Sequence, residues 1–211
     1  MTKEEFIENL KKINIYPTEQ QLSILERFYN KMIEWNKKIN LTRITEKEEV
    51  YLKHYYDSLT LNKAIDLNRV ETLCDVGTGA GFPGIVIKIF FPKIKITLID
   101  SLQKRINYLN EIIKELNLKD IEAIHTRGED FKGKYEVVTS RAVANIEKLL
   151  NFTMHLVDEN GIFIAMKGNI EEELNDKVRT IIEKKYKITD IINFNLPMEE
   201  SKRSLIIIKN K

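Results

Sequence analysis

The sequence has few cysteines and histidines, and it has no long apolar run. Cys74 is the single cysteine among 211 residues, which excludes an internal disulfide bond and a cysteine-based zinc cluster. Its place in an apolar segment predicts a packed core thiol rather than a nucleophile. With three histidines and no cysteine cluster, we expect no metal site. No stretch approaches the ~20 apolar residues of a membrane span, and the first residues are polar and acidic instead of forming a signal segment, so we expect a cytoplasmic protein.

Charge of neither sign is in marked excess. The chain has 34 lysines and arginines against 32 aspartates and glutamates, a formal net charge of +2, and no basic run forms a tail. A nucleic-acid partner would therefore have to meet a folded basic patch, and composition neither favours nor excludes RNA. The length and the 43% share of hydrophobic residues allow one sizeable core with a small appendage.

The first 65 residues predict three helices. Thr2, Thr18 and Thr45 are each followed three residues later by Glu or Gln, the capping-box pattern, and then by apolar residues at helical spacing. The segment 35–42, between the second and third helices, mixes polar and aromatic residues and is either a packed connector or part of a binding surface. We expect residues 1–65 to form a helical cap on a body made by residues 66–211.

In the body, short apolar runs alternate with helix-length amphipathic segments, which is typical of an α/β fold with a parallel sheet. The last two strands are joined by a polar turn at Pro197, so they should form a hairpin that places one antiparallel strand in a seven-stranded sheet. The predicted strands are 71–76, 95–100, 121–126, 135–140, 161–167, 187–195 and 203–209. The predicted helices are 84–91, a segment that starts at Ser101 as N-cap, 144–157 and 170–184.

A glycine-rich loop joins the first strand of the body to its first helix. Gly77, Gly79 and Gly81 permit positive φ or the close approach of a ligand, and Pro83 suits a first helical turn. The loop also contains the G-x-G-x-x-G spacing of the dinucleotide fingerprint, which is weak evidence by itself. The glycines either make only a tight turn or cradle a nucleotide or nucleoside.

Two strand-end carboxylates favour the ligand interpretation. Asp75 ends the first strand, and Asp100 ends the second, about where a ribose-binding acid lies in a βαβ unit. The whole pattern, Asp-x-Gly-x-Gly-x-Gly, resembles the loop of class I S-adenosylmethionine-dependent methyltransferases. Their Rossmann-like, seven-stranded sheet also ends in an antiparallel hairpin.

Several further motifs resemble the bacterial 16S rRNA guanine-N7 methyltransferase family (RsmG, formerly GidB). They are Asn40-Leu41-Thr42, His54-Tyr55-Tyr56-Asp57-Ser58-Leu59, Asp75 to Gly84, Arg127-Gly128-Glu129, Ser140-Arg141-Ala142 and Lys167-Gly168. Gly128 departs from the family, which usually has alanine there. The resemblance implies methyl transfer from S-adenosylmethionine to N7 of a guanine in the 530-loop of 16S rRNA. It implies a monomer that acts on this rRNA or on a mature or assembling small ribosomal subunit.

The resemblance also implies a cofactor site. Its expected residues are Asp75, Gly77 and Gly79 for the charged amino-acid end, Asp100 and Ser101 near the ribose, Phe82 beside the sulfonium or the adenosine, Gly128 and Glu129 for the adenine edge, and Arg141. For Phe82, a role in the core alone is the alternative.

Three basic residues follow the third, fourth and fifth strands, at the edge where open α/β sheets bind ligands. We expect Arg127, Arg141 and Lys167 to converge there as catalytic residues that face phosphates or a guanine edge. The alternative is that each only pairs with a neighbouring acid such as Glu129 or Glu136.

Some assignments stay open at the level of sequence. His54 and Asp57 lie three apart on one helical face, where they either serve the site or only bind each other. Asp57 and Glu129 are also candidates for stabilising positive charge during transfer. Two competing functions are a methyltransferase of the same fold for a small molecule or protein, and an inactive cofactor-sensing or RNA-binding module.

Overall fold

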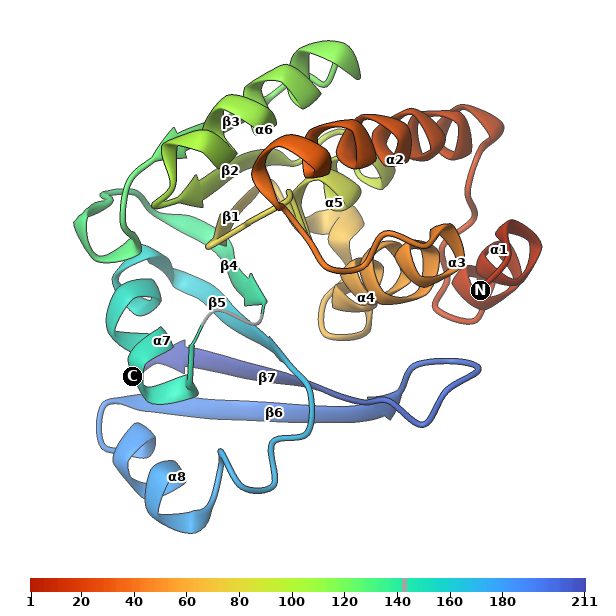
Figure 1. Cartoon of the computed structure of the whole chain (residues 1–211). Coiled ribbons are helices and arrows are strands. Elements are labelled where there is room, and N and C mark those ends of the chain that lie inside the picture. The colour runs from red at the N-terminus through yellow and green to blue at the C-terminus, as the bar shows by residue number, and fades with distance from the viewer. Residues whose placement is uncertain (142–143) are drawn as a thin grey trace.

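A seven-stranded mixed sheet forms the centre of the protein (Figure 1). The computed structural model describes residues 1–141 and 144–211, so Ala142 of one family motif lies outside the described residues. The strand order is β3-β2-β1-β4-β5-β7-β6, and β7 runs antiparallel to both of its neighbours. The strands are β1 (Thr72–Val76), β2 (Lys95–Asp100), β3 (Ile121–His125), β4 (Tyr135–Arg141), β5 (Val157–Lys167), β6 (Tyr186–Asn195) and β7 (Lys202–Asn210). The predicted α/β fold, the seven strands and the terminal hairpin are confirmed.

Two layers of helices cover the sheet, because alternate residues of each strand point to opposite faces. On one face, Leu73 and Ile207 pack with α5 (Gly84–Phe90), α6 (Gln103–Glu115) and the N-terminal helices. On the other face, Cys74 and Ile206 pack with α7 (Ile146–Thr153) and α8 (Asp176–Glu183). Cys74 is fully buried, as expected of a core thiol.

The N-terminal segment is helical, as predicted. In α1 (Lys3–Lys11) and α2 (Glu19–Ile39), complete capping boxes at Thr2 and Thr18 confirm the predicted starts. The third start is wrong by one residue: α3 (Lys47–Val50) has Glu46 as its N-cap, and no side-chain hydrogen bond caps it. The Thr45 carbonyl accepts a hydrogen bond from the Tyr29 hydroxyl. The helix continues through a π-helical turn (Tyr51–Tyr56), α4 (Asp57–Leu59) and a 3-10 turn (Thr60–Lys63).

Ser101 is not the N-cap of α6. The helix begins after Leu102, whose backbone N–H donates to the Asp100 carboxylate at 2.9 Å. No side chain caps this helix, and the aspartate at the strand end instead fixes the turn that leads into it. The other predicted helices are shorter than expected, since Asn145 caps α7 and Asn175 caps α8.

The cap and the body share one hydrophobic core. Phe28 and Tyr55 of the cap lie against Phe82 of the glycine loop, with ring centroids 5.4 and 6.2 Å from it. All three side chains are buried in one cluster that also includes Leu98 of β2. The division that we expect after residue 65 is thus crossed by continuous packing. Of the helices in the described ranges, none combines the length and the apolar character that a membrane crossing needs.

Candidate active site

The glycine loop presents bare backbone to a cleft. Gly77, Gly79 and Gly81 have φ of 74, 61 and 93°, the left-handed region that disfavours side chains. The loop packs closely on its other side, where a Cβ added to Gly84 would lie 2.2 Å from Leu98 Cδ2. The sequence predicted this loop correctly as the junction of a strand and a helix.

Asp75 stabilises the loop from its inner side. We expected this residue to border the cleft, and it does not. Its Oδ2 accepts hydrogen bonds from the Thr78 hydroxyl at 2.7 Å and from the Gly84 N–H at 2.9 Å, while Oδ1 has no partner in the described chain. The side chain is fully buried, and this burial raises the pKa of the carboxyl to about 6. Asp75 points inward because the loop folds back over it, so direct contact with the amino-acid end of a cofactor is not supported.

Two adjoining hollows meet at the end of β2. The larger, a cleft of about 630 Å³, runs from the glycine loop past Phe82 to the ends of β5 and β7. The smaller, of about 270 Å³, is bordered by the segment after β3. Gly77, Asp100 and Ser101 line both. Asp100 is fixed there because its Oδ2 accepts from the Gly79 N–H at 3.0 Å and from Arg105 at 3.1 Å.

The smaller hollow contains the expected adenine-edge residues Gly128 and Glu129. A Cβ on Gly128 would lie 2.9 Å from the Phe152 carbonyl oxygen, so an alanine here would require the neighbouring backbone to shift. Arg127 also lines this hollow, with its side chain 72% exposed and 4.0 Å from Glu129. An exposed pair at that distance contributes little to stability.

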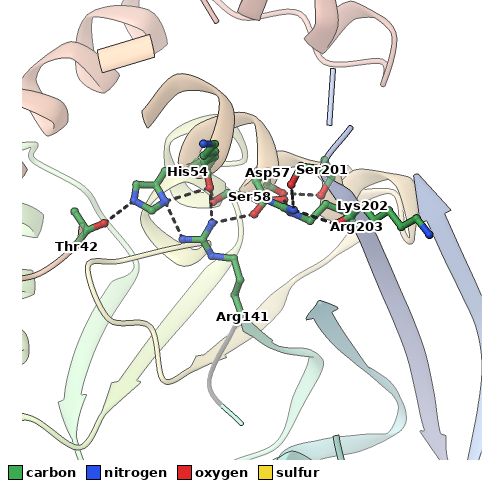
Figure 2. A network of polar contacts seen from close by, with 10 residues as sticks. Thr42, His54, Asp57, Ser58, Arg141, Ser201, Lys202 and Arg203 are labelled. Carbon is green, nitrogen blue, oxygen red and sulfur yellow. Dashed lines mark hydrogen bonds and ion pairs between the residues drawn. The ribbon is translucent and has the colours of Figure 1, made fainter. Parts of the chain in front are cut away.

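The main cleft contains a network of polar contacts centred on Asp57 (Figure 2). Arg141 Nη1 donates to Asp57 Oδ2 at 3.0 Å, and Nη2 donates to His54 Nδ1 at 3.1 Å. Arg203 Nε donates to the other carboxylate oxygen, Oδ1, at 2.9 Å. His54 and Asp57 thus turn toward Arg141 and not toward each other, so the intrahelical alternative is wrong. Asp57 ties α4 of the cap to β4 and β7.

His54 is held neutral by this arrangement. His54 Nδ1 lies 3.1 Å from Arg141 Nη2 and 3.2 Å from the Lys53 carbonyl oxygen. The arginine can only donate, so its contact, the shorter of the two, makes Nδ1 the acceptor and leaves the ring proton on Nε2, which donates to Thr42 Oγ1 at 3.0 Å. The ring also stacks on Phe82, with centroids 4.3 Å apart. Burial and the nearby Arg141 charge lower the pKa of His54 to about 3. Thr42 belongs to the segment 35–42, which therefore does reach the cleft.

A pH-dependent stability difference should follow from His54. Its pKa is 6.5 when unfolded and about 3 when folded, so below pH 6.5 the unfolded chain binds a proton that the folded protein does not. When the pH is lowered from 7.5 to 5, the free energy of unfolding of the wild type should fall by about 2 kcal/mol more than that of a His54→Gln variant. Urea unfolding at both pH values measures this. His155→Gln, which changes an exposed histidine, should behave as the wild type; equal losses for His54→Gln and the wild type would contradict a neutral His54.

Lys167 differs from expectation because it is not a surface residue. Its side chain is 8% exposed, its ammonium lies 2.7 Å from Glu173, and it also donates to the Ala144 carbonyl. Arg141 and Lys167 both line the main cleft, whereas Arg127 lines the smaller hollow. The structure therefore brings together two of the three basic residues, and each of the three pairs with an acid.

Arg203 is the residue that sequence reasoning missed. It lines the cleft and completes the Asp57 network. A signal was available, because the first residues of an antiparallel strand lie at the same sheet edge as the last residues of its parallel neighbours. In the described ranges, no three histidine, cysteine, aspartate or glutamate residues are grouped so that they could hold a metal ion.

Comparison with known proteins gives the family. The model of the GidB family, described as rRNA small subunit methyltransferase G, matches residues 21–205. This chain belongs to that family. Its relatives named Ribosomal RNA small subunit methyltransferase G include one from Lysinibacillus sphaericus, 42% identical over 98% of this chain and 90% of its own length. The Staphylococcus aureus relative is 43% identical over 100% of this chain and 91% of its own length. For the Acetivibrio thermocellus relative, the match is 48% identical but spans 65% of this chain and 59% of the relative.

Solved structures show the same fold at low sequence identity. A ribosomal protein L11 methylase from Lactobacillus delbrueckii subsp. bulgaricus has a TM-score of 0.56 at 18% identity, over 80% of this chain and 81% of that one. An O-methyltransferase of Brevibacillus brevis in complex with S-adenosyl-L-homocysteine has a TM-score of 0.55 at 15% identity, over 73% and 70% of the two chains. The GidB-family chain described here therefore has the class I methyltransferase fold.

S-adenosylmethionine is the methyl donor that this family and fold imply, and the two hollows fit it. A cradle of bare glycine backbone suits the amino-acid end, since the missing side chains allow close approach. The Gly77 and Gly79 N–H groups themselves donate within the chain, to the Ile99 carbonyl and to Asp100. Asp100, at the junction of the hollows, is placed between that cradle and the Gly128-Glu129 backbone, as a ribose acceptor must be. Phe82 borders the cleft but is 3% exposed and packed in the core, so it serves the core whatever else it contacts.

Asp100 is the first residue on which this assignment can be tested. An Asp100→Ala variant should bind S-adenosylmethionine roughly 1–3 kcal/mol more weakly, because polar groups of the ligand lose a charged acceptor. Calorimetric titration measures the dissociation constant. Asp158→Ala, an exposed position on β5, is the matched control and should leave it unchanged. An unchanged constant in Asp100→Ala would remove this residue from the site.

Proposed function

We propose that this protein transfers a methyl group from S-adenosylmethionine to N7 of a guanine in the 530-loop of 16S rRNA. The observation that supports it most is the cationic wall of the cleft, which is continuous with the glycine loop. Arg141 and Arg203 bring two positive charges against the single negative charge of Asp57, while His54 is neutral. Sites for small molecules are usually lined by apolar groups, whereas a site for a polyanion such as RNA needs basic side chains.

The chemistry requires positioning and no general base. Guanine N7 has an in-plane lone pair and no proton at neutral pH, so nothing must be abstracted before it attacks. Bound S-adenosylmethionine supplies an electrophilic methyl group on a sulfonium. His54 is not available as a base, since both ring nitrogens are engaged within the chain. The contribution of the protein is to hold the guanine in a reactive orientation.

In our proposal, the three basic residues have different roles. Arg141 is fixed by Asp57 and His54 and presents the remaining face of its guanidinium to substrate and cofactor. Arg127 lies exposed at the smaller hollow and binds RNA phosphate. Lys167 acts from a buried pair with Glu173, so it positions the β5 end of the cleft.

The cofactor is held by backbone and by one carboxylate in this proposal. Gly77 and Gly79 bind its amino-acid end, Asp100 and Ser101 bind the ribose, and the Gly128-Glu129 backbone meets the adenine. Asp57 is saturated by two arginines and Glu129 lies in the smaller hollow, so neither is placed to offset charge on the purine. We infer that the protein acts as a monomer in the cytoplasm, on 16S rRNA or on a mature or assembling small subunit.

Replacing the target guanosine by 7-deazaguanosine tests the reacting atom. Because the analogue has carbon at position 7, it should bind but accept no methyl group. Wild-type protein is incubated with labelled S-adenosylmethionine and with reconstituted subunits or naked rRNA that carry either nucleoside, and the label is mapped. Unmodified rRNA is the control. Methylation of the 7-deaza substrate at that nucleotide would show that N7 is the wrong atom.

A further inference from the structure

The far end of the main cleft contains a phenyl ring and an arginine side by side. Phe194 on β6 and Arg203 on β7 lie directly opposite each other in the antiparallel register, so their side chains leave the same face of the sheet. The next pair on this face, Ile192 and Leu205, packs into the core. The sheet face thus passes from core to cleft at Phe194 and Arg203, which both line the cleft.

Phe194 can offer an aromatic face, whereas Phe82 cannot. Among the described residues that line the cleft, these are the two phenyl rings. Phe82 is buried, with the His54 ring 4.3 Å, the Phe28 ring 5.4 Å and the Arg141 guanidinium 5.3 Å from its centroid. Phe194 is partly exposed and packs at the margin of the core. The Lys63 ammonium lies over one face of its ring, 5.3 Å from the centroid, so a base would stack on the opposite face.

Arg203 has one nitrogen left for a ligand. Nε donates to Asp57, and Nη1 donates to the Ser201 hydroxyl and the Lys202 carbonyl. Nη2 makes no hydrogen bond within the part of the chain that the structure describes. An arginine usually binds guanine with two nitrogens, on O6 and N7, and that fork would cover the reacting atom. Arg203 cannot form this fork, because Asp57 holds Nε while the Ser201 hydroxyl and the Lys202 carbonyl hold Nη1.

We propose that Phe194 and Arg203 form the guanine subsite, in which the target base stacks on Phe194 and accepts a hydrogen bond from Arg203 Nη2 at O6. Stacking uses the face of the base and leaves its N7 edge accessible. A base drawn out of an RNA stack needs such a replacement surface. This subsite rests on the proposed function and specifies its substrate contacts.

Variants of Phe194 test the stacking surface. Phe194→Leu keeps apolar volume and removes the aromatic face, so kcat/KM for rRNA should fall roughly tenfold or more, whereas Phe194→Trp should retain activity. The dissociation constant for S-adenosylmethionine should not change in either variant. Ile192→Ala, on the same face but in the core, is the control and should stay within about threefold of the wild type per folded molecule. Near-wild-type turnover by Phe194→Leu would overturn the stacking role while leaving the proposed function intact.

Base analogues test the Arg203 contact. In wild-type protein, 2,6-diaminopurine at the target keeps N7 but replaces the O6 acceptor with a donor, so kcat/KM should fall about tenfold or more. Inosine keeps O6 and N7 and should react within about threefold of guanosine. Equal turnover of the diaminopurine substrate would overturn the contact to O6. Absence of methylation even with guanosine would instead contradict the proposed function.

Discussion

An Arg141→Lys variant is expected to lose roughly a hundredfold in kcat, the scale of a catalytic group displaced by about 1 Å. Arg141 uses one guanidinium to bind Asp57 Oδ2, the Lys53 carbonyl and His54 Nδ1 at once. A lysine ammonium is a single point that cannot span these three acceptors. Methylation of small subunits under saturating cofactor measures the loss.

The matched control is Arg69→Lys, since Arg69 is 86% exposed in a surface pair with Asp66. That variant should keep wild-type activity and stability. Unchanged kcat in Arg141→Lys would mean that charge alone, and not the planar fork, is what the cleft requires.

A Gly84→Ala variant should show the largest loss of stability. The added Cβ would lie 2.2 Å from Leu98 Cδ2 and 3.0 Å from Asp75 Oδ2. Leu98 and Asp75 are fully buried, so neither can move without displacing packed neighbours. We expect the free energy of unfolding to fall by about 2–3 kcal/mol, from overpacking and a weakened Gly84–Asp75 hydrogen bond.

Urea unfolding measures that loss, and Gly168→Ala is its control. A Cβ on Gly168 has the Lys202 carbonyl oxygen as its nearest neighbour, at 3.9 Å, so the variant should stay within about 0.5 kcal/mol of the wild type. Should both alanine variants prove equally stable, the loop would be looser than its distances indicate.

Most of the fold could be predicted because its patterns are local. The strands were predicted to within a few residues, since each is a short apolar run bounded by polar turns, and two capping boxes located α1 and α2. The third cap helix was harder because a π-helical turn interrupts it at Tyr51–Tyr56, and no period in the sequence encodes such a turn. Ser101 was misassigned because the helix begins one residue later, after a turn in which the Leu102 N–H donates to Asp100.

The site was predictable where its residues are neighbours in sequence. The glycine loop and Asp100 were found from one βαβ unit. The contact between Asp57 and Arg203 joins residues 146 positions apart, which no local pattern reveals. The partly exposed partner of Lys167 was missed for a different reason, since Glu173 lies in a segment that was expected to be helix and in the structure precedes α8.

The packing of the cap on Phe82 limits how this enzyme can admit RNA. A lid that swings on a hinge must expose the surface beneath it, and here that surface includes the fully buried Phe28 and Tyr55. Exposing each large apolar side chain costs about 1.5–3 kcal/mol, and the Asp57 ion pairs would separate as well. The cap is therefore a fixed wall. We therefore expect the RNA, and not the cap, to change shape when the proposed guanine enters the cleft, which would favour targets that can be unstacked at low cost.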